Sequence, residues 1–65
     1  MITQIGQTAG VIWQILDEEG PVSLTALKKQ VKAPEVMVYM ALGWLAREDK
    51  LQFTPQGRSY SVRLR

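Results

Sequence analysis

The chain contains no cysteine and no histidine among its 65 residues. Without cysteine there are no disulfide bonds, and no thiolate can bind a metal or attack a substrate. Without histidine there is no imidazole, which removes the usual zinc sites and the Ser-His triads. We therefore expect neither a metal site nor a cofactor.

Long apolar runs are also missing. No stretch approaches the roughly 20 apolar residues that cross a bilayer, and no basic start precedes an apolar segment as in a signal peptide. Apolar residues make up 46% and charged residues 22% of the chain, an ordinary globular composition. We therefore expect a single cytoplasmic domain over residues 1–65 with no membrane partner. Its small core must be dense, or a partner must help to cover it.

Groupings typical of catalysis are scarce as well. The acidic run Asp17–Glu19 is consecutive, so a helix spreads its carboxylates around its circumference. Gly6 and Gly10 fall inside a helical pattern and follow no strand, unlike a phosphate-binding loop. We therefore predict that the protein is not an enzyme.

Acidic and basic residues occupy separate segments of the chain, although the net charge is only +2. Residues 1–20 and 35–49 are acidic, at −3 and −2, whereas residues 21–34 and 50–65 are basic, at +3 and +4. A segregated basic surface attracts polyanions, most often phosphate backbones. The alternative is that these charges only keep a small domain in solution.

Helical periodicity dominates the first three quarters of the chain. An apolar stripe predicts a helix over residues 3–19, which Gly20-Pro21 ends. Ser23 is a good N-cap for a second helix over residues 24–31, and a third is expected over residues 35–48. The apolar stripe of the first helix contains Ile5, Ala9, Ile12 and Leu16, widened by Val11, Trp13 and Ile15. That of the third contains Val38, Ala41, Leu42 and Leu45, beside Met37 and Trp44.

The apolar period changes to two after Asp49, which indicates strands. Leu51 and Phe53 alternate with polar residues before a turn at 55–58. A second alternating run follows at Tyr60, Val62 and Leu64. This is a β-hairpin with one apolar face, and a short strand at Val22 can join its sheet. The fold class is therefore α+β: a winged helix-turn-helix, in which a C-terminal hairpin wing packs on three helices.

Three segments are also similar to a known family: residues 5–13, residues 27–29 and, most specifically, Ala-Leu-Gly-Trp-Leu-Ala-Arg-Glu-Asp-Lys at 41–50. They resemble a family of small bacterial and archaeal winged helix-turn-helix proteins of largely uncharacterised function. The resemblance covers nearly the whole chain and implies a winged-helix fold. It implies a transcription-regulator-like role in DNA binding by analogy with that fold.

The candidate residues favour contacts with the backbone of double-stranded DNA over base reading. The third helix offers only Glu35 and Tyr39 as hydrogen-bonding groups at its start, so it is poorly equipped to read bases. Hydroxyl-bearing and basic side chains around the second helix and at the expected wing tip are suited to contact phosphates. The candidate DNA-binding residues are Ser23, Thr25, Lys28, Lys29, Lys32, Tyr39 and Arg58.

A protein-interaction module is the alternative, and a homodimer would be one form of it. Val36, Tyr39 and Gly43 form a partly apolar strip on the side of the third helix that faces away from its core stripe. Gly43 either lets a partner approach or relieves crowding against Trp13 or Tyr60. Trp44 flanks the core stripe, and we expect it in the core.

Overall fold

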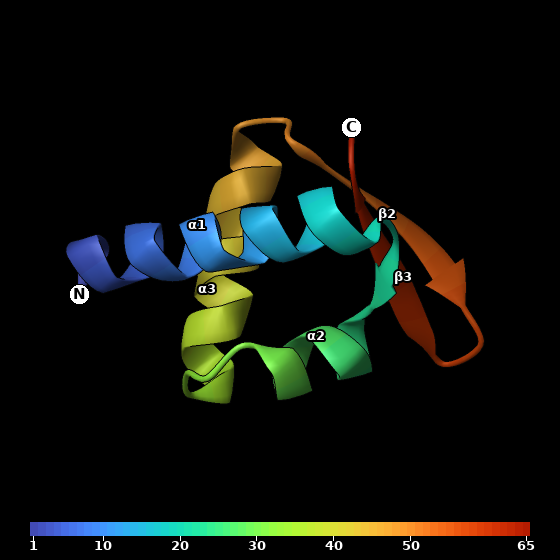
Figure 1. The fold of residues 1–65 in the computed structure, drawn as a ribbon, viewed down its shortest axis with the longest axis horizontal. Helices are drawn as coiled ribbons and strands as arrows, with labels where there is room; N and C mark the ends of the chain where they lie inside the picture. The colour runs from blue at the N-terminus through green and yellow to red at the C-terminus, as the bar shows by residue number, and fades with distance from the viewer.

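The computed structural model describes all 65 residues as three helices and a three-stranded antiparallel sheet (Figure 1). The chain order confirms the predicted α+β architecture, and each helix boundary lies within one residue of its predicted position. The elements are α1 (Ile2–Glu19), β1 (Val22–Ser23), α2 (Leu24–Gln30), α3 (Glu35–Arg47), β2 (Leu51–Gln56) and β3 (Ser59–Leu64).

The core lies between the three helices and the sheet. In Figure 1, α1 crosses in front of α3, while α2 runs below α1 from the sheet towards the start of α3. All twelve buried residues are apolar, and no buried side-chain nitrogen or oxygen atom lacks a hydrogen-bond partner. The core consists of Ala9, Ile12, Leu16, Val22, Leu27, Val31, Val38, Ala41, Leu42, Leu45, Leu51 and Val62.

The sheet has the strand order β1-β3-β2, so β3 is central and β2 is an edge strand. Val22 pairs with Val62, which confirms the short third strand. Pro55 lies within β2 opposite Tyr60, whereas the sequence predicted it in the turn. An edge strand tolerates proline because one row of its backbone groups has no partner strand.

The hairpin turn is consequently shorter than predicted. Gln56 still pairs with Ser59, which leaves only Gly57 and Arg58 in the loop. Gly57 has a φ of 61° and Arg58 has a negative φ, the pattern of a type II′ turn. The turn places Arg58 at the tip of the wing.

Several apolar side chains that the sequence placed against the core lie at the surface instead. Val11 and Trp13 on α1 are 48% and 42% exposed, so they do not widen the buried stripe. Phe53 and Tyr60 are also exposed. Phe53 lies opposite the buried Val62 but on the edge strand β2, and Tyr60 lies on the part of the hairpin that extends beyond the helices (Figure 1).

Candidate nucleic-acid interface

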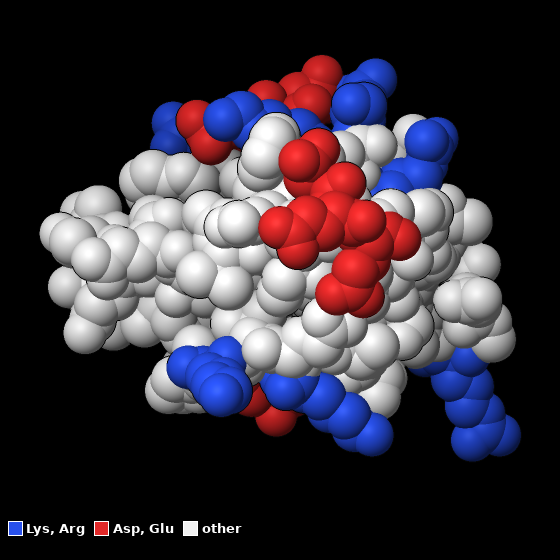
Figure 2. Space-filling view, in the orientation of Figure 1, with Lys and Arg blue, Asp and Glu red and all other residues white.

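Basic side chains lie along two edges of the molecule. Figure 2 shows Lys and Arg side chains along the lower edge beneath α2 and, farther right, where the hairpin turns; a second group lies along the upper edge, where acidic side chains are interspersed. Acidic side chains form a separate patch over the C-terminal half of α1. We call the residues Lys28, Lys29, Lys32 and Arg58 the basic rim.

The two hydroxyl-bearing candidates, Ser23 and Thr25, differ in what they can offer a ligand. The Ser23 hydroxyl caps α2 by accepting a hydrogen bond from the Ala26 amide at 3.1 Å. This bond fixes the start of α2 and occupies the hydroxyl as an acceptor. Thr25 is exposed in the first turn of α2, and its hydroxyl makes no hydrogen bond within the chain.

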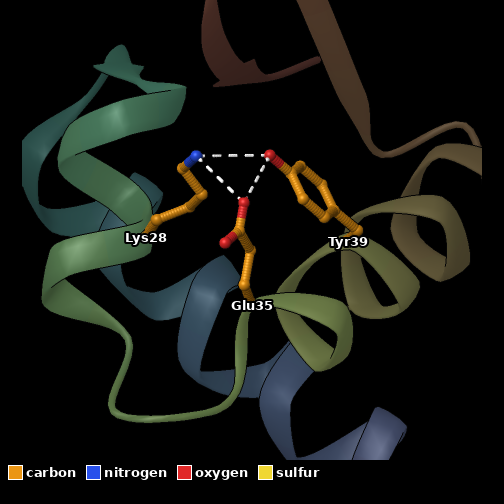
Figure 3. A network of polar contacts seen from close by, with 3 residues as sticks. All are labelled: Lys28, Glu35 and Tyr39. Carbon is orange, nitrogen blue, oxygen red and sulfur yellow. Dashed lines mark hydrogen bonds and ion pairs between the residues drawn. The ribbon is translucent and has the colours of Figure 1, made fainter.

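Lys28 joins α2 to α3 through a three-residue network (Figure 3). Its Nζ lies 3.3 Å from Glu35 Oε1 and 3.3 Å from the Tyr39 hydroxyl oxygen. The Tyr39 hydroxyl in turn donates to Glu35 Oε1 at 3.2 Å. The sequence separations of seven and eleven residues are bridged only because α2 and α3 meet across the turn.

The network also stabilises the charged form of Lys28. Hydrogen bonds first to Tyr39 and then to Glu35 raise the pKa of Lys28 above its ordinary value of 10.5. The ammonium lies 5.6 Å from the centre of the Tyr39 ring, within cation–π range. Because Glu35 compensates this charge, Lys28 offers less to a phosphate than the sequence suggests.

The other three residues of the basic rim carry uncompensated charge. The ion pairs in the chain are Lys28–Glu35, Lys50–Glu48 and Arg65–Asp49. Lys29, Lys32 and Arg58 are exposed and belong to none of them. They are therefore free to meet an anion without breaking an existing contact.

Amide side chains beside Lys32 add a feature that the sequence analysis missed. Two neighbouring hollows of about 320 and 370 Å³ lie between α1 and the segment joining α2 to α3. Both are lined by Gln7, Thr8 and Lys32, and Gln4 and Gln30 each line one of them. Gln4 and Gln7 lie eighteen or more residues before Thr25, the first candidate on α2, so only the crossing of α1 over the turn brings them beside Lys32.

The outward side of α3 carries no charged side chain before Arg47. Val36, Tyr39, Met40 and Gly43 are all exposed there. Trp44, expected in the core, is 40% exposed. A Cβ built on Gly43 meets nothing within 4 Å, so the predicted crowding against Trp13 or Tyr60 is wrong.

Comparison with known proteins agrees with this architecture. The model of the family described as "Winged helix-turn-helix domain (DUF2582)" matches residues 1–64. The chain belongs to this family. It is 37% identical over 65 residues to the uncharacterised protein MJ1608 of Methanocaldococcus jannaschii, covering 95% of this chain and 91% of that one. It is also similar to the solution NMR structure of protein BT2368 from Bacteroides thetaiotaomicron, with a TM-score of 0.82 and 27% identity over 95% of this chain and 76% of the other.

In this winged helix-turn-helix domain, α2, the turn at 31–34 and α3 form the helix-turn-helix, and β2 and β3 form the wing. In DNA-binding members of this architecture the second helix of the motif lies in the major groove. Here that helix is α3. No helix is long and apolar enough to span a membrane, and no group of three or more His, Cys, Asp or Glu side chains is placed to hold a metal ion.

Proposed function

We propose that this winged helix-turn-helix domain associates with double-stranded DNA through phosphate contacts and with little sequence preference. The observation that carries the proposal is the position of Lys29, Lys32 and Arg58. These three basic side chains of the basic rim are exposed and have no ion-pair partner. The rim joins the first helix of the motif to the wing tip. Lysine and arginine at such places neutralise phosphates and so supply affinity without reading sequence.

The weak sequence preference follows from α3. Base edges in the major groove are read by hydrogen-bonding side chains such as Arg, Asn and Gln. The outward side of α3 presents Val36, Met40 and Gly43, which have no such groups. Glu35 and Tyr39 do, but both are held in the network with Lys28.

Fluorescence anisotropy with labelled duplexes tests this function. Two duplexes of equal length and unrelated sequence should bind with affinities equal within about threefold at low salt, since non-specific contacts supply the affinity. No binding to either duplex, even at tens of micromolar protein, would contradict the proposal. Strong preference for one duplex would contradict its second part, the lack of base reading.

Replacement of Glu35 by glutamine is expected to strengthen DNA binding. Glutamine keeps an acceptor for Lys28 and Tyr39 but removes the negative charge that compensates Lys28. Lys28 then becomes an additional phosphate contact, and affinity should rise at least about threefold at moderate salt. Glu48→Gln is the matched control, because it frees Lys50 outside the basic rim. Equal effects of the two substitutions would show that only net charge matters.

A further inference from the structure

The wing carries two exposed aromatic rings on one face of the sheet. Phe53 of β2 pairs with Val62 of β3, so their side chains lie on the same face. Tyr60 is two residues from Val62 on β3 and therefore shares that face. Val62 is fully buried in the core, whereas Phe53 is 41% and Tyr60 48% exposed. The face that covers the core at Val62 thus continues as an uncovered aromatic surface towards the tip of the wing (Figure 1).

The two rings lie close enough together to bind one ligand. Phe53 and Tyr60 are diagonal neighbours on adjacent strands, a relation that places residues about 7–8 Å apart, within reach of aromatic side chains. Pro55 pairs with Tyr60 and is the third exposed residue of this face. We call Phe53, Pro55 and Tyr60 the wing platform. None of the three belongs to the core cluster, so their apolar surface is available to a ligand.

The charge around the wing platform indicates what can occupy it. Residues 51–65 contain three arginines and no acidic residue. Arg58 at the tip belongs to no ion pair, and Figure 2 shows a basic but no acidic side chain where the hairpin turns. The acids that precede β2, Glu48 and Asp49, lie at its other end and are paired with Lys50 and Arg65. The occupant should therefore carry negative charge as well as a flat surface that stacks on rings.

Unpaired nucleotides have both properties. Every base has a π face that can stack on an aromatic side chain, and every phosphate carries negative charge. Proteins that bind single strands combine such stacking with basic groups that follow the backbone. Inside a duplex the bases stack on one another and leave no face for Phe53 or Tyr60. The exposed rings therefore favour unpaired DNA, and Arg58, two residues before Tyr60, connects the wing platform to the basic rim.

We propose that the wing platform stacks unpaired DNA bases beside a duplex held on the basic rim. A forked end, at which the two strands separate, offers both parts at once. The inference deepens the proposed function, because it names the form of DNA, and it rests on that function for the position of the duplex. Stacking on Phe53 and Tyr60 is a separate contact, so it can fail while binding to a blunt duplex persists.

Anisotropy titrations with three labelled DNAs test the wing platform. They are a blunt duplex, the same duplex with a forked end, and the same fork with abasic nucleotides in its unpaired arms. The abasic arms keep the phosphates but offer no base to stack. The wild type should bind the fork at least about fivefold more tightly than the abasic fork, the effect of one stacked base. Equal affinity for the two forks would overturn the proposal.

Ring substitutions locate the contact. Phe53→Leu keeps apolar bulk on the sheet but removes the flat ring, and Tyr60→Ala removes the other ring. Each should lose most of the preference for the base-bearing fork, whereas Tyr60→Phe should keep it. Trp13→Ala is the matched control, because Trp13 is 42% exposed but lies on α1, one turn before Asp17. Circular dichroism should show all four variants folded. Phe53→Leu combined with Tyr60→Ala contradicts the proposal if it prefers the fork as strongly as Trp13→Ala does.

The blunt duplex separates this inference from the proposed function. The ring variants should bind it within about twofold of the wild type, because Lys29, Lys32 and Arg58 are unchanged. A wild type that binds the blunt duplex but does not distinguish the two forks retains DNA binding and refutes the wing platform. A wild type that prefers the base-bearing fork but does not bind the blunt duplex retains the stacking contact and refutes the duplex on the basic rim.

Discussion

Leu27→Ala is expected to leave little or no folded protein at 37 °C. Leu27 is the one buried residue of α2 and is 0% exposed. Truncating a fully buried leucine costs about 2–5 kcal/mol through lost burial and the cavity left behind. A 65-residue domain has a free energy of unfolding of only roughly 3–10 kcal/mol. The loss therefore amounts to much or all of the stability of the domain.

Urea unfolding followed by circular dichroism measures this effect. Val36→Ala is the appropriate control, since Val36 is on the outer side of α3 and contributes no contact to the core cluster. Its free energy of unfolding should change by no more than about 0.5 kcal/mol. A loss below about 1 kcal/mol for Leu27→Ala would mean that α2 does not depend on this contact.

Reversing the two free lysines of the helix-turn-helix is expected to abolish measurable DNA binding. In Lys29→Glu with Lys32→Glu, two phosphate contacts are lost and two negative charges face the backbone. Each contact contributes roughly threefold in affinity near physiological salt, and repulsion adds to that loss. We therefore expect affinity to fall at least about thirtyfold for every duplex sequence alike.

The control for this variant must carry the same net charge. Lys50→Glu with Arg63→Glu changes the charge by the same amount at residues outside the basic rim, where Lys50 pairs with Glu48 and Arg63 donates to Gln52. Anisotropy titrations of both double variants should show the larger loss for Lys29→Glu with Lys32→Glu. Equal losses would contradict a localised binding rim.

The fold could be predicted because the sequence features that specify it are either local or periodic. Val38, Ala41, Leu42 and Leu45 fall on one side of a helix by spacing alone, and all four are buried. The side-chain cap at Ser23 and the alternation around Val62 depend equally on neighbours in sequence. Such signals fix which elements form and which side of each faces inward.

The surface of the fold was less predictable, because it depends on how elements cross. Periodicity marks Trp44 and Phe53 as members of apolar faces, but a 65-residue fold has too few layers to cover both. The network of Lys28 with Glu35 and Tyr39 forms only because two helices meet across a turn. No spacing rule within one helix predicts such a contact.

The salt dependence of duplex DNA binding tests the central claim most directly. Three phosphate contacts, from Lys29, Lys32 and Arg58, predict that the logarithm of the association constant falls against the logarithm of salt concentration with a slope of about −3. The substitution Arg58→Gln should bring that slope close to −2. A slope near zero, or no binding at low salt, would contradict an interface built on phosphates.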